Sequence, residues 1–579
     1  MFEEDGNEPF TRNRNRLERL VSFRYYNRHD KADDIERNRN RDDVSSNRYT
    51  LLALYSIAVN YILGVGCLGM PYAFARSGLL LGIALIVGVS ILSYATAMYV
   101  AEAEVRVRRL GKGYLLCKNK NQQHNVSDST SNEHNNIDHD DDTKNVYMNA
   151  IATERTALVR HIKYGQGDAD DSSNNITIEV SELVELLLGP FHGALYKISL
   201  LALMYIGLLA FTQVFRGSLK ALLQSGNADE GNASFVSAFF FALVVVPLSC
   251  MELDEQVSVQ TAMAMIRFLA LFIMILGSII ALYTNPYGGG IDEDTISSST
   301  SSAPQAPYLA PTVDGEMSYT VCFSGFGLAF STALFSQLFQ HSIPGLLKPL
   351  DVEKRGRVKL TLGAVLFTTS AFYLILGSSA ALYFGSNLCS SVNLNFANFT
   401  FGLSDEESSA SPLLLRICQV ASNFVVLFPA LDTLSIFPLI AITLGNNLAS
   451  SFPQLHDFAK KYQIGNQNHL SVKIVTAFWR LVASIPPIIF SLWATDLSFS
   501  LQLAGIAGLE VAFFAPALLQ RSSCAFITKR FGKNETETVY SGWHSNRGFV
   551  ICVLVFATFS LCVVLVQIRG AWIDMRNRA

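Results

Sequence analysis

The sequence predicts an all-α integral membrane protein of about eleven transmembrane helices, with the first and sixth helices interrupted. Half of the 579 residues are hydrophobic and only 16 % are charged, whereas a soluble domain carries about 25 % charged residues. Apolar windows of membrane-spanning length recur along the chain. The first of them contains a cluster of glycines at its centre. Together these observations exclude an ordinary soluble domain and favour a membrane protein with a polar site between its helices.

Eleven windows are apolar enough to cross a bilayer core, which takes about 20 helical residues. One of them, 413–442, contains Pro429 and Pro438, and we expect a single tilted or bent helix there. The windows lie near 51–74, 78–102, 193–218, 233–251, 262–283, 318–343, 360–384, 413–442, 474–494, 497–520 and 548–568.

Lysine and arginine in the connections predict the orientation of these helices, because cytosolic loops are enriched in both. The N-terminal tail and the connections at 103–180, 344–359 and 521–547 are rich in them, and the loops at 224–232, 284–317 and 386–412 contain none. We therefore expect a cytosolic N terminus. The predicted organisation is a disordered cytosolic tail at 1–50, a transmembrane domain at 51–568 with a disordered cytosolic insertion at about 113–178 and an outer loop at 285–317, and an outer or lumenal tail at 569–579.

Two kinds of modification are conceivable on the predicted outer face. The sequons at Asn232 and Asn398 fall there and are glycosylation candidates, which would make the protein a glycoprotein. Cys322 and Cys389 also lie near that face, and either a disulfide or two free thiols fits the sequence.

The first window is interrupted by Gly64, Val65 and Gly66, and then by Gly69 and Pro71. Backbone groups freed by such a break find no water in the bilayer core. Non-helical backbone at that depth is tolerated where it is buried in protein or lines a cavity. The break therefore predicts a small-solute site near the membrane midplane.

A five-plus-five inverted repeat places a second broken helix at position six. The sixth window has glycines at its start and ends in Gln340, His341 and Pro344. Its small polar residues Thr332 and Ser336, with Gln337, are substrate-binding candidates together with Gly64, Val65 and Gly66. The alternative for these residues is helix-to-helix packing, which also uses serine and threonine.

Three stretches carry a resemblance to a known family: NYILGVGCLGMPYAFARSG at 60–78, FSQLFQHSIPGLLKP at 335–349 and NFVVLFPALDTLSIFPLIAITLGNN at 423–447. With these the chain resembles the amino acid/auxin permeases, and within them the transmembrane protein 104 branch. The resemblance implies a LeuT-like fold and secondary transport of amino acids driven by protons or sodium.

The resemblance also implies roles for particular residues. Gly64 and Gly66 match an unwound stretch whose free N–H groups meet the substrate carboxylate, and Asn60 and Ser422 match oxygen ligands of a sodium ion. The chain departs from the sodium-coupled pattern after Pro429, where the sequence reads FPALDTL with Asp432. The coupling ion, H⁺ or Na⁺, is therefore left open.

Ionisable residues inside apolar windows are further candidates, because charge there is costly and commonly functional. Asp432, Glu510 and His341 are candidates for carrying a proton. The alternative is a static ion pair that holds helices together, for example Arg480 with Asp432 or Glu510. We expect Arg267 and Arg480 to snorkel or to form such pairs.

The leading hypothesis is an ion-coupled symporter of amino acids that works by alternating access. The alternative is a sensor that binds an amino acid and signals with little flux. No motif indicates an enzyme, a cofactor, a metal centre or nucleic-acid binding, so we expect an amino acid and the lipid bilayer as partners. The membrane, whether plasma membrane or endolysosomal or vacuolar, stays open, as does the oligomeric state, with which a monomer is compatible.

Overall fold

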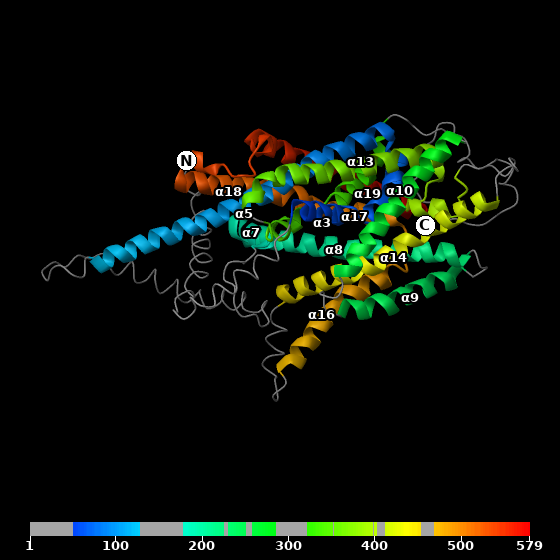
Figure 1. The fold of residues 1–579 in the computed structure, drawn as a ribbon, viewed down its shortest axis with the longest axis horizontal. Coiled ribbons are helices and arrows are strands. Elements are labelled where there is room, and N and C mark those ends of the chain that lie inside the picture. Colours follow the sequence, from blue (N-terminus) through cyan, green and yellow to red (C-terminus); the bar gives the residue numbers. More distant parts are fainter. Residues whose placement is uncertain are drawn as a thin grey trace.

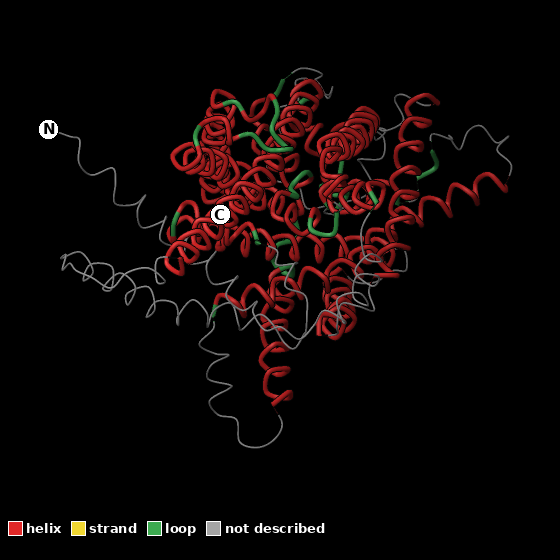
Figure 2. The backbone as a smooth tube through the Cα atoms, turned by 60° about the vertical axis from the view of Figure 1, so that its left-hand side comes forward, coloured by secondary structure: helices red, strands yellow, loops and turns green. Residues whose placement is uncertain are grey.

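The computed structural model describes residues 50–127, 178–224, 230–250, 257–284, 321–350, 352–397, 399–401, 412–452 and 468–578. Regular structure in these ranges is helical, and the helices assemble into one bundle (Figures 1 and 2). The N-terminal tail, most of the 113–178 insertion, and the 285–317 loop lie outside the described residues.

Seven helical spans are long and apolar enough to cross a membrane, and an eighth is added when the bent first pair is taken as one span. The spans come from helices α5 (Leu79–Ser127), α8 (Pro190–Gln224), α10 (Val257–Thr284), α13 (Val358–Phe384), α14 (Pro412–Ser451), α17 with α18 (Leu497–Leu509 and Ala515–Phe531) and α19 (Arg547–Arg578). Two further helices, α9 (Glu230–Cys250) and α16 (Asn468–Phe490), are shorter in their apolar part. The predicted fold class is confirmed, and each predicted window contains helix.

The first window is broken as predicted. Helix α3 (Leu51–Ile62) and helix α4 (Gly66–Ser77) meet at an angle of 56°. The Thr50 hydroxyl caps the start of α3 by accepting a hydrogen bond from the Ala53 N–H at 3.1 Å. The two helices are separated by Leu63, Gly64 and Val65, so the break lies where the sequence placed it.

The sixth window is broken too. Helix α11 (Phe326–Ser336) stops after eleven residues, and a turn, the short η5 (Gln340–Ser342) and α12 (Ile343–Leu347) follow. Pro344 lies in the first turn of α12, where its missing N–H costs nothing. Both interrupted helices therefore have backbone groups near the middle of the bundle that are not paired within a helix.

One long span runs through a π-helical turn. Residues Glu510–Phe514, between α17 and α18, form this turn. Such turns inside α-helices are frequently found at functional sites. The turn packs against α8 and α5 and against the start of the second part of the sixth segment.

Helix α5 is longer than its predicted window and projects beyond the bundle in Figure 1. Its backbone stays helical to Ser127, so its last turns overlap the insertion that the sequence predicted to be disordered. Extending an existing helix avoids the unfavourable nucleation step, which explains why polar residues can continue it.

Candidate functional site

A cavity of about 650 Å³ begins at the break of the first helix and runs toward the bundle end that carries Thr50. It reaches the exposed residues Glu179 and Gly345 near that end. The volume lies in the range of small-molecule sites. Its wall is largely apolar and includes Leu200, Leu203, Met204, Phe211, Phe335, Leu338, Ile436, Leu439 and Ile440.

Backbone donors face the cavity at the break. Gly64, Val65 and Gly66 line it, and a Cβ on Gly64 would meet no heavy atom within 4 Å. The Gly64 N–H is used in a bond to the Ile62 carbonyl at 2.8 Å. Among the described residues, no backbone acceptor lies within hydrogen-bond reach of the Val65 and Gly66 N–H groups. These two free donors stand at the N-terminus of α4, where the helix dipole favours an anion.

The guanidinium of Arg267, from α10, lies against the same break. Its Nη1 atom donates to the Asn60 side-chain oxygen at 2.6 Å and to the Leu63 carbonyl at 2.7 Å. Its Nη2 atom lies 2.7 Å from Oδ1 of Asp432 on α14, and the Nε atom donates to Oδ2 at 3.1 Å. The side chains of both residues are buried, at 4 % and 9 % exposure. The guanidinium thus joins the end of α3 to α14.

Asp432 is therefore in an ion pair, as one of the two sequence interpretations allowed. Its partner is Arg267 and not Arg480. The Arg480 Nη1 atom donates to the Cys250 carbonyl at 3.2 Å. The sequence misplaced the partner because Arg267 lies near one end of its window, while its long side chain reaches the broken backbone. Whether Asp432 also carries a proton stays a prediction.

Tyr373 of α13 joins the two broken helices. Its hydroxyl lies 2.8 Å from the Ile62 carbonyl at the end of α3 and 3.0 Å from the Ser336 carbonyl at the end of α11. The side chain is fully buried. One hydroxyl thus serves two carbonyls that the helix breaks leave without helical partners. No sequence pattern singled out this residue.

The substrate-binding candidates of the sixth segment divide into two groups. Ser336 lines the cavity, although its hydroxyl already donates to the Thr332 carbonyl at 2.7 Å. Thr332 and Gln337 are fully buried and do not line the cavity. The Gln337 amide donates to Ser370 at 3.2 Å. The cavity therefore brings together Gly64, Val65, Gly66 and Ser336.

Two polar side chains in the cavity wall have unpaired atoms among the described residues. They are the hydroxyl of Tyr196, which is completely buried, and Nδ1 of His341. The His341 ring also contacts Tyr61 edge-on, with 6.4 Å between ring centroids. Both atoms are available to a polar ligand. The sequence singled out His341 but not Tyr196, since a tyrosine in an apolar window carries no distinctive signal.

Two ion-coupling candidates lie away from the cavity. The Ser422 hydroxyl donates to the Phe396 carbonyl and accepts from the Phe399 N–H at 3.2 Å, so it holds a connection at the other end of α14. Ten residues separate it from Asp432, about 15 Å along a helix. Glu510 is half-buried in the π-helical turn and does not line the cavity. The structure therefore does not bring Asn60 and Ser422 together.

The modification candidates are only partly described. Asn232 lies in α9, but its side chain is outside the described set, and so is the whole of Asn398. Glycosylation at either stays a prediction. Cys322 and Cys389 are both free thiols in the structure.

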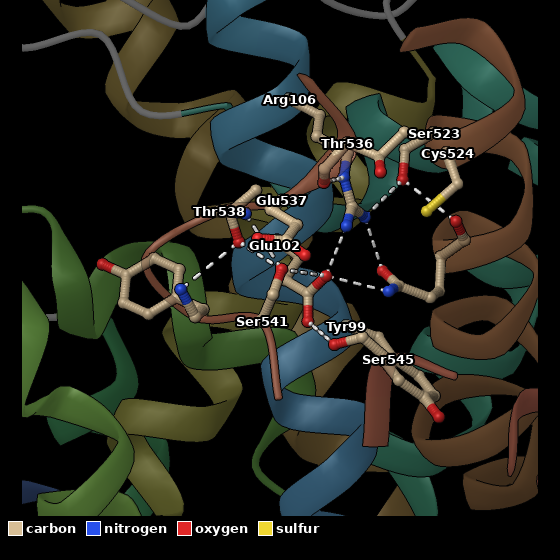
Figure 3. A network of polar contacts seen from close by, with 12 residues as sticks. Tyr99, Glu102, Arg106, Ser523, Cys524, Thr536, Glu537, Thr538, Ser541 and Ser545 are labelled. Atoms are coloured by element: carbon tan, nitrogen blue, oxygen red, sulfur yellow. Dashed lines mark hydrogen bonds and ion pairs between the residues drawn. The ribbon is translucent and has the colours of Figure 1, made fainter. Parts of the chain in front are cut away.

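A second buried polar cluster lies around Glu102 and Arg106, near the middle of α5 (Figure 3). Glu102 accepts from Gln520 at 2.8 Å, from Ser541 at 3.1 Å and from Ser545 at 2.5 Å, and it forms an ion pair with Arg106. We call Glu102, Arg106, Gln520, Ser523, Ser541 and Ser545 the α5 cluster. Arg106 and Glu102 are almost completely buried.

The α5 cluster fixes the connection between α18 and α19 to the bundle. Arg106 also donates to the Thr536 carbonyl at 3.0 Å, and the Tyr99 hydroxyl donates to the His544 carbonyl at 2.7 Å. In the same connection, burial raises the pKa of Tyr540 to about 12, so its hydroxyl stays neutral at physiological pH. The sequence analysis missed this cluster, because Glu102 lies at the last position of an apolar window, where a charged residue is unremarkable.

The sequence of the chain is similar to those of known membrane proteins. The family model described as "Transmembrane amino acid transporter protein" matches residues 48–114, which include the whole first break. A transmembrane protein 104 homolog of Dictyostelium discoideum is 22 % identical over 534 residues, covering 89 % of this chain and 96 % of the relative. Human transmembrane protein 104 is 21 % identical over 489 residues, covering 79 % and 84 %.

The predicted resemblance is confirmed. The chain is similar to amino acid transporters in its first helices and to transmembrane protein 104 proteins along most of its length. Among solved structures, the inward-facing conformation of Mhp1 has a TM-score of 0.45 at 10 % identity, covering 90 % of this chain and 91 % of that one. A manganese transporter of Eremococcus coleocola has a TM-score of 0.40 at 10 % identity, covering 91 % and 96 %.

Proposed function

We propose that the protein is a secondary transporter of amino acids, coupled to protons or sodium, which works by alternating access about the two broken helices. The observation that carries the proposal is the cavity of about 650 Å³ that ends at unwound backbone in the middle of the bundle. Unwound backbone at that depth supports a polar solute. The match of residues 48–114 to an amino acid transporter family supports the same function.

The geometry supports an amino acid with an apolar side chain. Its carboxylate would accept from the free Val65 and Gly66 N–H groups, next to the positive charge of Arg267. Its ammonium group would face the Ser336 carbonyl, which keeps a lone pair besides the one that Tyr373 uses, whereas the Ile62 carbonyl already accepts from both Tyr373 and the Gly64 N–H. The side chain would then lie along the apolar wall formed by residues such as Leu203 and Phe211.

In the proposed cycle the structure is the state that is open to the cytosol. The loop charges predict a cytosolic N terminus, and the cavity opens toward the end of the bundle that carries Thr50 and Glu179. The opposite half is closed by helix packing. Movement of α3 and α4 with α11 against the other helices would close the cavity and open the other side.

An uptake screen tests this function. The purified protein is reconstituted into liposomes, and uptake of radiolabelled amino acids is measured under an imposed proton gradient and then an imposed sodium gradient. We expect concentrative uptake of an apolar amino acid in one of the two. Specific binding without uptake under either gradient would reject the carrier in favour of the sensor. A matched pair, Tyr196→Phe and Tyr99→Phe, checks the site, and only the first should lower substrate affinity.

A further inference from the structure

A cation position at the first break is filled by a side chain of the protein itself. The family resemblance implies a sodium ion bound to Asn60, with freed backbone carbonyls as further oxygen ligands. The structure holds these oxygens at the break, and Arg267 donates to them. Its Nη1 atom is 2.6 Å from the Asn60 side-chain oxygen, 3.1 Å from the Asn60 carbonyl and 2.7 Å from the Leu63 carbonyl.

The carboxylate that would neutralise a bound cation is also engaged. Nη2 of Arg267 lies 2.7 Å from Oδ1 of Asp432, and Nε lies 3.1 Å from Oδ2. A sodium ion would need the same lone pairs that the guanidinium uses. It would also place a second positive charge beside a guanidinium that is only 4 % exposed. The residues present therefore do not fit sodium at this position.

The remaining ligand that the resemblance implies is absent from the position. Ser422 bonds to the Phe396 carbonyl and the Phe399 N–H, about 15 Å along α14 from Asp432. A hydroxyl there cannot complete a shell around an ion held by Asn60. Sodium therefore does not fit this position for two independent reasons. The oxygens there already bond to Arg267, and the Ser422 hydroxyl lies elsewhere.

We propose that Arg267 is a resident cation that takes the place of the coupling sodium ion, so that solute binding at the break does not depend on sodium. The inference rests on the proposed transport function and narrows it. Arg267 is a positioning residue: it ties the end of α3 to α14 and supplies fixed positive charge beside the free Val65 and Gly66 donors.

Removal of Arg267 should have an effect that removal of a merely structural arginine would not have. Truncation of Arg267 leaves the Asp432 carboxylate, the Asn60 side-chain oxygen and two backbone carbonyls facing a space without a cation. Several oxygens including one charged carboxylate are what a hard cation requires. Arg267→Ala should therefore create a sodium site, whereas Arg267→Lys should keep a resident cation and create none.

Thermal stability of the purified full-length protein tests this without any uptake assay. Melting temperatures are measured in sodium chloride and in choline chloride at equal ionic strength. We expect the wild type to melt at the same temperature in both. Arg267→Ala should melt lower in choline, and sodium should raise its melting temperature by on the order of 2 °C or more, because a bound ligand stabilises the folded state by mass action.

Two further variants test whether the sodium effect belongs to this position and to its carboxylate. Arg216→Ala removes another buried arginine, whose hydrogen-bond partners are serine oxygens, and should show no sodium effect. In the double variant Arg267→Ala with Asp432→Asn, the sodium effect should disappear with the carboxylate. If Arg267→Ala is too unstable to purify, Arg267→Gln takes its place, since the shorter neutral side chain also leaves Asp432 without a charged partner.

The outcomes separate this inference from the transport function. A wild type that sodium stabilises, or whose uptake requires sodium, would overturn the resident cation, and so would an Arg267→Ala protein that is indifferent to sodium. Absence of uptake for every amino acid would reject the transport function while leaving the melting comparison intact. Sodium-independent uptake by the wild type, with sodium stabilisation confined to Arg267→Ala, would establish both.

Discussion

The two halves of the bundle on either side of the breaks are built differently. On the side of α4, helices approach so closely that glycines are required. A Cβ on Gly325 would lie 2.6 Å from the Ser77 backbone nitrogen, and one on Gly505 would lie 2.6 Å from the Ser331 Cα. On the side of α3, Gly64 and Gly345 both line the cavity and have no heavy atom within 4 Å of a built Cβ.

This difference shows how the first pair of helices, α3 and α4, can close one half of the bundle and line a solute cavity in the other half. Where α4 meets α11 and α17, small residues bring the backbones together and leave no space for a solute. Where α3 turns away at the break, the same helices leave a cavity. The polar groups then gather at the boundary between the halves, where Arg267 and Tyr373 hold the broken ends.

The largest expected effect concerns the α5 cluster, which fixes a connection at the end of the open half. Glu102→Gln keeps the size of the side chain but leaves the buried Arg106 without a charged partner. Removing one partner of a buried ion pair costs about 3–5 kcal/mol. We expect a large loss of thermal stability in detergent, together with faster proteolysis between Gly532 and Asn546.

A matched control is available two residues along the same helix. Glu104 pairs with Arg108, whose side chain is 39 % exposed. Glu104 is itself buried, but Arg108 can turn its charge toward water when the pair is broken, so Glu104→Gln should cost less than Glu102→Gln. Equal losses for both variants would show that the α5 cluster does not stabilise the connection.

The next prediction compares two glycines at the boundary. A Cβ on Gly66 would clash with the Ser336 hydroxyl oxygen and lie 3.1 Å from the Ser336 Cα, whereas Gly64 faces open space. Gly66→Ala should destabilise the protein by about 1–3 kcal/mol through overpacking. Gly64→Ala should stay within about 0.5 kcal/mol of the wild type. Melting temperatures of the two variants check this, and the reverse order would contradict the close contact between Gly66 and Ser336.

A smaller effect is expected at the bridge between the broken helices. Tyr373→Phe removes one hydroxyl and leaves the Ile62 and Ser336 carbonyls without it. The expected cost is about 1 kcal/mol, because the buried Ser336 carbonyl loses the hydroxyl while the Ile62 carbonyl keeps the Gly64 N–H. Tyr205→Phe is the control, since its hydroxyl donates to the Val482 carbonyl from a half-buried position away from the breaks. A cost for Tyr373→Phe no larger than the control would reject the bridge.

The sequence predicted the fold and the place of the site, but only part of the site's chemistry. Breaks at Gly64–Gly66 and before Pro344 were readable because glycine and proline interrupt an otherwise regular apolar period. The partner of Asp432 was not readable, since several arginines lie in apolar windows and only the packing decides which one reaches it. Tyr373 was missed because its role depends on two carbonyls that are 37 and 311 residues away along the chain.

The division of the sixth segment shows the same limit. Thr332 and Ser336 lie one helical turn apart, and both are small polar residues suited to a solute site. Thr332 is turned into the sealed half, with its methyl group 3.7 Å from a Cβ built on Gly69, while Ser336 lines the cavity. Helical spacing places both on one face, but only the position of the break decides where the seal ends and the cavity begins.

Side-specific labelling tests the one-sided cavity most directly. Gly64→Cys and Thr332→Cys are each labelled with a membrane-impermeant maleimide in sealed vesicles of both orientations, and the wild-type labelling is subtracted. We expect Gly64→Cys to react from the face that carries Thr50 and Glu179 much faster than from the other face, and Thr332→Cys to stay unreactive from both. Faster labelling of Gly64→Cys from the opposite face, or ready labelling of Thr332→Cys from that face, would contradict the one-sided cavity.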